Sequence, residues 1–472
     1  MNTETLMQDP RTRRTFLART SLGLGSASLA HLFASSQASP GAGALGAPNL
    51  APRAKRVIYL HMSGGPSQLE TFDPKPGLAR WDGKPLPAEV RGDQRLTTMT
   101  STQGTINVMS SQHKFARHGQ AGIEMNTLFR HMPGIADDIC MIRSAFTDPI
   151  NHDPAVTFLQ TGSPLSGRPS MGSWLSYGLG SDNENLPAFV VLLSGGGQPV
   201  PSRYWHNGFL PSRHQGVKFQ SSGDPVLFLS NPRGMSRENR RKTIDRISAL
   251  NQIKQQQVGD PEIEARIDAF QLAYRMQSSV PELMDISRES KSVLESYGAQ
   301  PGKPSFAANC LLARRLAEAG VRFIQLYDRG WDHHDGITNG IKNKINTVDK
   351  ASSALLQDLK ARGLLEDTLV IWGGEFGRTT YAQTRSKNFG RDHHPRCFSM
   401  WMAGGGIKPG ALYGETCEFG YNITRDPFHV HDLQATILHL LGIDHEGLTY
   451  RFKGRDFRLT DVHGQVIREI IA

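Results

Sequence analysis

Five short apolar runs recur along the chain, and each is followed at once by glycine-rich or polar residues. The runs are residues 56–62, 188–193, 321–327, 368–372 and 397–403. Continuous apolar runs of this length are typical of strands that are buried on both faces. An amphipathic helix pattern precedes the third run, so strands and helices alternate. The pattern predicts an α/β fold with a doubly wound, mostly parallel sheet and helices on both of its faces.

A different pattern fills about residues 235–300. Residues 236–257 are charged and helical in character, and residues 261–277 place their apolar positions on one helical stripe. This segment predicts a helical insertion, either a lid or a packing element. A last helix is expected over residues 433–441, and no internal repeat is visible.

Composition narrows the function classes only slightly. The chain has 472 residues, of which 38% are hydrophobic and 21% charged, as in an ordinary globular protein. Its formal net charge of +9 is compatible with anionic substrates, but an unremarkable basic protein has the same balance and is the simpler interpretation. No Lys/Arg tract is interleaved with aromatic residues, so no nucleic-acid partner is expected.

The N-terminus has the features of an export signal. Arg13 and Arg14 form a twin-arginine pair, a weakly apolar stretch follows over residues 21–34, and small residues at 36–38 fit a cleavage site. The stretch is too short and too mild for a stable membrane span. We therefore expect export of the folded protein by the Tat translocase to the periplasm or the extracellular space.

Three segments follow from this interpretation. Residues 1–38 are the expected signal peptide, residues 39–52 a flexible linker, and residues 53–472 the main domain. The four cysteines are too few for a disulfide scaffold. A bridge between Cys397 and Cys417 is one possibility in an oxidising compartment, and buried free thiols are at least as well supported.

Polar clusters follow the third and fourth apolar runs and precede the fifth. They are residues 328–335, 375–378 and 392–395. One such cluster alone is more often a hydrogen-bonded loop, but three at strand ends favour a divalent-metal site. Carboxylates mixed with imidazoles suit zinc, manganese or another borderline cation, and carboxylates alone suit magnesium or calcium. Asp332 and His334 are two residues apart and therefore share one side of an extended backbone.

At these residues the sequence resembles the sulfatase-like family known as domain of unknown function 1501, placed in the alkaline phosphatase-like superfamily. The matching motifs are MSGGPSQLETFDPKP at 62–76, GWDHH at 330–334, GEFGRT at 374–379 and DHHP at 392–395. The resemblance spans nearly the whole domain. It implies the doubly wound core of that superfamily with a hydrolytic site for one or two metals.

The chain departs from the superfamily at the covalent nucleophile. His152 stands at the position of the sulfatase Cys or Ser, and Val156 stands at the position of the following arginine, although Pro154 and the later Thr-Gly are kept. This argues against a formylglycine sulfatase. The first-strand metal aspartate is also missing at Ser63.

Several ligand positions are kept or replaced. Glu70 or Asp73 could substitute for the missing aspartate. Glu375 stands at the start of the superfamily's Asp-His pair, and His394 matches its last histidine. The expected ligands of the divalent metal are Asp332, His334, Glu375 and His394.

The expected function is an exported, metal-dependent hydrolase of sulfate or phosphate esters, acting on an anionic small molecule or glycan ester. His152 is the expected general base or a further ligand, positioned by Asp153, and water is the attacking group. Arg378 and Lys387 could pair with anionic oxygens of the substrate or be solvated surface charges.

Two alternatives remain. The chain could be a non-catalytic relative that binds a polyanionic glycan or a partner protein. It could also be an isomerase or mutase, which would require a nucleophile such as Ser63, Ser67 or Thr157.

Overall fold

The structure is a computed structural model. It describes residues 43–197, 199–221, 223–227, 229–383 and 388–472. The expected signal peptide and Lys387 lie outside the described residues, so export remains a prediction. Residues 43–52 differ from the flexible linker that their composition predicts. Their backbone binds the body, with Ala44 N 2.7 Å from Tyr177 O and Leu50 N 2.9 Å from Gly442 O.

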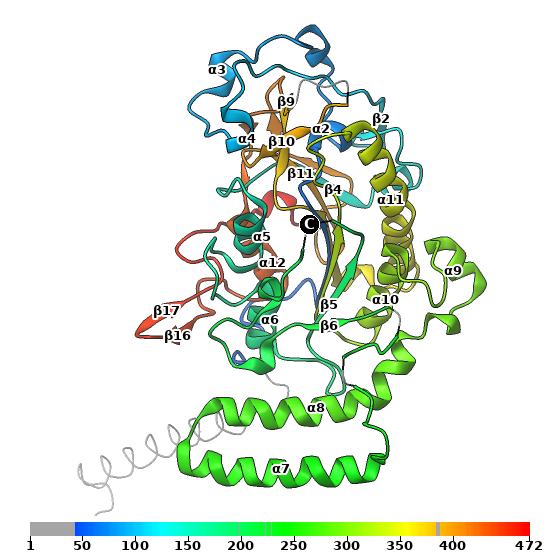
Figure 1. Cartoon of the computed structure of the whole chain (residues 1–472), viewed down its shortest axis with the longest axis vertical. Coiled ribbons are helices and arrows are strands. Elements are labelled where there is room, and N and C mark those ends of the chain that lie inside the picture. Colours follow the sequence, from blue (N-terminus) through cyan, green and yellow to red (C-terminus); the bar gives the residue numbers. More distant parts are fainter. Residues whose placement is uncertain (1–42, 198, 222, 228, 384–387) are drawn as a thin grey trace, which may run out of the picture.

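A nine-stranded sheet forms the centre of the molecule (Figure 1). Its strand order is β12-β4-β11-β8-β1-β7-β5-β6, with β15 beside β4. The strands are β1 (Arg56–Ser63), β4 (Ile139–Phe146), β5 (Phe189–Ser194), β6 (Val217–Phe219), β7 (Phe323–Arg329), β8 (Thr368–Gly373), β11 (Phe398–Ala403), β12 (Ala411–Tyr413) and β15 (Phe428–His429). The five apolar runs are therefore all strands of this sheet.

One of the five runs enters the sheet in the opposite direction. β11 pairs antiparallel with both β4 and β8, whereas the other described pairs of this sheet are parallel. The glycines after β11 consequently lie at the amino edge, where Gly404 meets the backbone of Leu365 and Thr368. The residues before β11 lie instead at the carboxyl edge of β4, β7 and β8. β11 therefore ends at the opposite edge of the sheet from the other four runs.

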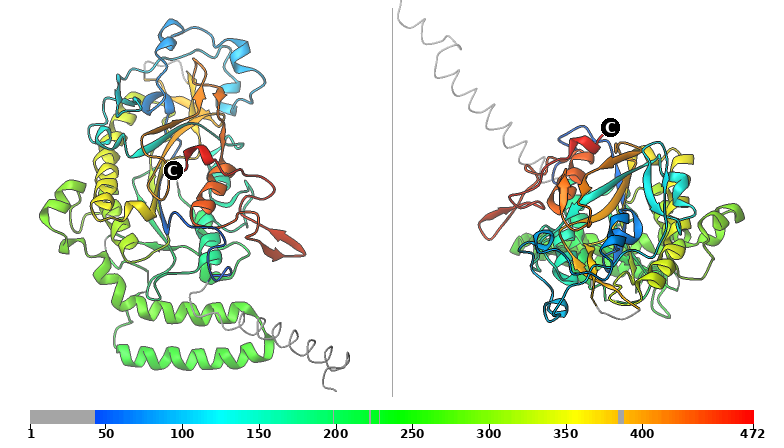
Figure 2. Two further views of the ribbon diagram at one scale, coloured as in Figure 1. Left: turned by 180° about the vertical axis from the view of Figure 1, so that it is seen from behind. Right: turned by 90° about the horizontal axis from the view of Figure 1, so that it is seen from above.

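Helices cover both faces of the sheet and bury two separate cores (Figures 1 and 2). α10 (Phe306–Glu318) and α11 (Ile337–Ala361) lie on one face, and α5 (His152–Thr161), α6 (Met171–Leu179) and α12 (Val430–Leu440) lie on the other. β1 shows the division, because Ile58 and Leu60 belong to the first core while Val57 and Tyr59 belong to the second. The doubly wound α/β class is confirmed.

The segment around residues 235–300 is helical. It holds α7 (Arg237–Val258), α8 (Pro261–Met284), a short 3₁₀ turn (Ile286–Arg288) and α9 (Lys291–Tyr297). α7 and α8 form a hairpin that projects from one end of the body (Figures 1 and 2). α9 packs back onto α11. Within the described chain, no helix combines the length and apolar content that a membrane crossing demands.

A two-stranded ribbon stands above the carboxyl edge of the sheet. It consists of β9 (Gly377–Ala382) and β10 (Arg391–His394). The short helix α2 (Gln68–Thr71) anchors it. Gln68 exchanges two hydrogen bonds of 2.8 Å with the backbone of Arg378, and Glu70 pairs with Arg391, with Oε1 2.9 Å from Nη2.

The two acidic residues expected as substitute ligands form ion pairs away from the metal-ligand cluster. Glu70 is fully buried against Arg391, and Asp73 pairs with Lys75 at 2.8 Å and accepts a hydrogen bond from Thr416. Neither carboxylate reaches the cluster described below. They fix the loop after β1 and the ribbon, which accounts for their place in the first motif. All four cysteines carry free thiols, so the bridge between Cys397 and Cys417 is not formed.

Candidate metal centre

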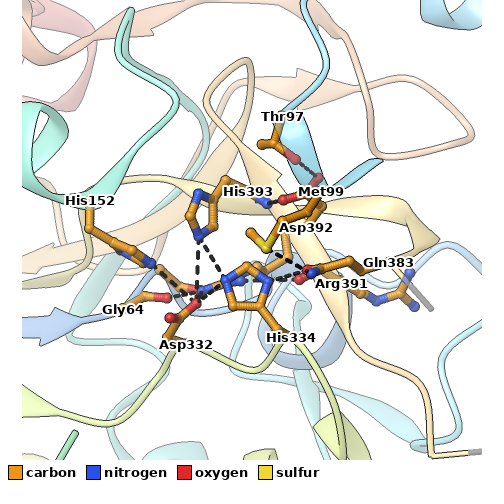
Figure 3. A network of polar contacts seen from close by, with 12 residues as sticks. Gly64, Thr97, Met99, His152, Asp332, His334, Gln383, Arg391, Asp392 and His393 are labelled. Carbon is orange, nitrogen blue, oxygen red and sulfur yellow. Dashed lines mark hydrogen bonds and ion pairs between the residues drawn. The ribbon is translucent and has the colours of Figure 1, made fainter. Parts of the chain in front are cut away.

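Three segments of the chain meet at the carboxyl edge of the sheet. The start of α5 contributes His152, the loop after β7 contributes Asp332 and His334, and β10 contributes His393. One potential ligand atom of each residue lies within 4.8 Å of the others. Figure 3 shows the three imidazoles arranged around the carboxylate. The convergence follows from topology, because β4 and β7 end at this edge and the reversed β11 begins there.

A single carboxylate oxygen lies at the centre of the group. Asp332 Oδ1 is 2.8 Å from Nε2 of His334, 3.1 Å from Nε2 of His152 and 3.5 Å from Nε2 of His393. The Nε2 atoms of His334 and His393 are themselves only 3.0 Å apart. All three rings therefore present the same nitrogen to one small volume.

The other nitrogen of each ring is held by an acceptor. His152 Nδ1 lies 2.7 Å from Glu375 Oε1, and His393 Nδ1 lies 2.9 Å from the carbonyl oxygen of Ile150. His334 Nδ1 bonds to the side-chain oxygen of Gln383. Because these partners accept, each Nδ1 carries the proton and each neutral ring has its lone pair on Nε2.

This arrangement fits a bound cation. Three Nε2 lone pairs and a carboxylate that point at one another would repel without a positive charge between them. Metal-binding histidines in general donate their other N–H to a carboxylate, a carbonyl or a water. The three rings here donate to one carboxylate, one amide oxygen and one backbone carbonyl. Three imidazoles and one carboxylate suit zinc or a similar borderline divalent cation.

Local charge also favours a cation. Asp332 and Glu375 contribute two negative charges against the single positive charge of Arg378. Burial opposes ionisation of Asp332, but the three imidazoles, which donate to it when they are protonated, and the nearby Arg378 hold its pKa well below the usual value. Burial likewise opposes ionisation of Glu375, yet its bond to His152 keeps the pKa of Glu375 below the usual value.

The imidazoles differ in their affinity for a proton. Burial lowers the pKa of His393 to about 4, so its ring is neutral at pH 7. Burial acts in the same direction on His152, but hydrogen bonds to Asp332 and Glu375 outweigh it and raise the pKa of His152. A metal ion would thus compete with a proton mainly at His152.

One side of the group is open to solvent. The exposed fractions are 14% for His152, 18% for Asp332 and 24% for His334. A cleft of about 850 Å³ lies nearby. Its lining includes Ile150, whose carbonyl oxygen accepts from His393, together with Arg95 and Arg396, but none of the four residues of the group. Structural zinc sites are closed, whereas catalytic sites keep an open position.

Only part of the expected ligand set comes together. Asp332 and His334 share the centre. His394 points to the opposite side of β10, where it is fully buried and bonds to the carbonyl oxygen of Tyr421 at 2.8 Å. Glu375 stands one layer back, where its Oε1 and Oε2 accept hydrogen bonds from the backbone N–H of Gly64 at 3.0 and 3.2 Å.

The residues expected to act in catalysis are also placed differently. His152 points into the group through Nε2. Asp153 does not position it, because its carboxylate is 56% exposed and binds Arg203 and Tyr204. Glu375 holds His152 instead.

Arg378 is fully buried and already occupied. Its guanidinium donates to Asp332 Oδ1 at 2.6 Å and to the carbonyl oxygens of Gly64, Gly65 and Arg391. It holds the loop after β1 and the carboxylate of Asp332 in place, and these bonds occupy four of its five N–H groups. Its buried positive charge balances Asp332.

The hydroxyls considered as covalent nucleophiles are all engaged. Ser63 Oγ lies 3.0 Å from Nδ1 of His61, Ser67 donates to Glu70, and Thr157 donates to the backbone of its own helix. None of them belongs to the four-residue group. This geometry gives an isomerase or mutase mechanism no support.

Three features of the site escaped sequence reasoning. His393 faces the centre in place of its neighbour His394, and the acceptors Gln383 and Ile150 come from segments with no metal-like motif. The sequence did carry a hint of His393: His393 and His394 are adjacent, and two successive residues of a strand face opposite sides, so one of the two had to face the centre.

The sequence matches the family described as "Protein of unknown function (DUF1501)" over residues 54–471. No curated protein matches it.

Three solved structures give the range of similarity in fold. The chain is similar to the PsFucS1 sulfatase from Pseudoalteromonas sp. at 12% identity, covering 89% of this chain and 72% of that one, with a TM-score of 0.38. The lipoteichoic acid synthase LtaP from Listeria monocytogenes is 9% identical, with a TM-score of 0.35, and the match covers 87% of this chain and 76% of that one. The alkaline phosphatase of the Antarctic bacterium TAB5 is 11% identical, with a TM-score of 0.32, and the match covers 83% of this chain and 98% of that one. A likeness at this level carries no inference about activity.

Proposed function

Since the chain belongs to the DUF1501 family, whose description names no activity, we propose from the site itself that the protein is an exported, metal-dependent hydrolase of phosphate or sulfate esters. The observation that supports this most is the set of three inward Nε2 atoms, each belonging to a ring whose Nδ1 proton is bound by an acceptor. The twin arginines Arg13 and Arg14 are the basis for export.

In this proposal the four residues of the group hold one divalent cation. His152, Asp332, His334 and His393 are the ligands. The cation, when bound, supplies a Lewis acid that polarises a phosphoryl or sulfuryl oxygen and makes water a stronger nucleophile. The chain's own residues bind, orient and balance charge around it.

Each second-layer residue has a separate task. Glu375 holds the Nδ1 proton of His152 and so keeps the Nε2 lone pair directed at the centre. Arg378 holds the carboxylate of Asp332 from behind. Water is the attacking group, because the nominated hydroxyls are bound elsewhere.

The cleft beside the site supports an anionic ester. Arg95 and Arg396 line it, and the pairing of Arg396 with the almost fully exposed Asp93, at 3.8 Å, is loose enough for a substrate oxygen to displace. Phe146 and Ile423 add an apolar surface for the alcohol portion of the ester.

The test combines metal analysis of the exported protein with turnover of an aryl phosphate and an aryl sulfate. We expect about one divalent cation per chain, and both metal and turnover lost in Asp332→Ala. Asp335→Ala is the matched control, because Asp335 is an exposed carboxylate outside the group.

Two outcomes would contradict the proposal in different ways. Folded protein without metal removes the hydrolase mechanism altogether. Stoichiometric metal with no turnover of either ester class indicates a non-catalytic metal protein that binds a glycan or a partner.

A further inference from the structure

The hairpin of α7 and α8 exposes an unusual share of the protein's apolar side chains. In the described chain, ten large apolar side chains are exposed, and four of them lie on this hairpin. Leu250, Ile253 and Val258 on α7 are 67%, 55% and 63% exposed, and Phe270 on α8 is 39% exposed. Apolar groups gathered on one projecting element generally mark an interaction surface.

Two exposed apolar residues of α7, Leu250 and Ile253, lie on the side that faces away from α8. Ile244 and Ser248 are its buried residues and face α8. Ile253 follows Ile244 by about two and a half helical turns and therefore points outward. Lys242, Arg246 and Leu250 precede Ile253 at helical spacing on the same side. We call these four residues, Lys242, Arg246, Leu250 and Ile253, the outer stripe of α7.

The charge of α7 is strongly positive. The helix carries six basic residues against the two acidic residues Glu238 and Asp245. Glu238 pairs with Lys242 at 2.7 Å, and Asp245 pairs with Arg241 at 3.0 Å. Arg246 forms no salt bridge with any residue that the structure describes. Of the two basic residues of the outer stripe, Lys242 is thus paired within the helix and Arg246 is not. An exposed face that mixes basic and large apolar residues is typical of helices that lie in a membrane interface.

We propose that the outer stripe of α7 docks the protein on an anionic phospholipid surface. Leu250 and Ile253 enter the boundary between headgroups and acyl chains, while Arg246 binds lipid phosphates, and Lys242 does so by exchanging its exposed pairing with Glu238. The hairpin lies at the opposite end of the molecule from β9 and β10, so docking leaves the edge that bears the metal group directed away from the membrane (Figure 1).

A second copy of the chain suits this face less well. An antiparallel pairing of two α7 helices centred on Leu250 would place Arg246 of one copy opposite Lys254 of the other. Like charges at such a contact repel one another. An anionic lipid surface instead complements both the basic and the apolar residues. The inference is independent of the proposed hydrolase activity.

Vesicle sedimentation tests the proposal. We expect the protein to bind vesicles of phosphatidylglycerol and phosphatidylcholine, to release as salt rises, and to bind pure phosphatidylcholine far less. The double variant Lys242→Gln/Arg246→Gln should lower the partition coefficient roughly 30-fold, at about 1 kcal/mol for each basic residue. Leu250→Ser/Ile253→Ser should lower it by about tenfold or more.

The control removes one charge and one exposed apolar residue elsewhere. Lys291→Gln/Leu165→Ser changes side chains that are 91% and 75% exposed outside the hairpin, and should bind as the unchanged protein does. All variants keep the same N-terminus, so residues 1–42 contribute equally. The proposal would be overturned if both variants of the outer stripe bound vesicles as strongly as the unchanged protein. A second result would also overturn it: the protein does not bind vesicles, light scattering shows that it is a dimer, and Ile253→Ser dissociates that dimer.

Discussion

At the scale of single residues, the orientation of each imidazole is fixed by its second nitrogen. Glu375, Gln383 and the carbonyl oxygen of Ile150 each hold one Nδ1 proton, and Nε2 is thereby directed inward. Glu375 differs from the other two because it is charged and buried, and because the backbone of Gly64 holds it in place. Its charge raises the basicity of His152, the ligand most exposed to competition from protons.

Glu375→Gln tests this role. The amide keeps the shape of the side chain but removes its charge, so we expect metal affinity to fall by about 10–100-fold with the fold intact. Competition with a chromophoric chelator measures the affinity, and circular dichroism checks the fold. Unchanged affinity would show that Glu375 only fills space beside His152.

Sequence reasoning could identify the residue types of the site but not their orientation. Asp332 and His334 were predictable because two residues in an extended segment share a side. For the pair His393 and His394 the same rule leaves two choices. Only the tertiary partner decides between them, since the carbonyl oxygen of Tyr421 takes His394 to the opposite face.

At the scale of elements, the reversal of β11 brings the site together. β4, β7 and β8 carry residues to the carboxyl edge at their ends, whereas β11 has to bring them at its start. Apolar runs reveal strands buried on both faces but carry no information about direction. The five strands were therefore predictable from the sequence, while the direction of β11 is set by its neighbours β4 and β8 in the sheet.

The contact between α6 and a following 3₁₀ turn (Ser212–His214) makes stability depend on pH. His214 is buried with Nδ1 2.9 Å from Ser176 Oγ, and burial together with the charge of Arg213 lowers its pKa to about 3. As pH falls, His214 therefore takes up a proton near pH 6.5 in the unfolded chain but only near pH 3 in the folded protein. This contribution to stability is full above that pH and is lost as pH falls below it.

Urea unfolding of His214→Gln at pH 8 and pH 5 checks this dependence. The unchanged protein should lose about 2 kcal/mol more than the variant between the two values, because one pKa unit corresponds to about 1.4 kcal/mol. Equal losses in both proteins would mean that His214 takes up its proton without unfolding.

At the scale of the whole molecule, the ribbon of β9 and β10, which contributes His393, and the projecting hairpin lie at opposite ends of one layered α/β body (Figure 1). The body supplies rigidity, since two apolar cores sandwich the sheet from which the ligand-bearing segments extend. The proposed activity requires that His152, Asp332, His334 and His393 together hold a single divalent cation.

The chain offers its own controls for that claim, because two ligands have a histidine neighbour that faces elsewhere. His333 is half-buried and His394 fully buried, and both lie outside the group, adjacent to His334 and His393. The most direct measurement is the metal content of purified His334→Ala, His393→Ala, His333→Ala and His394→Ala. We predict that the first two lose the cation, and that the last two keep about one per chain. Metal retained by His393→Ala and lost by His394→Ala would contradict the account.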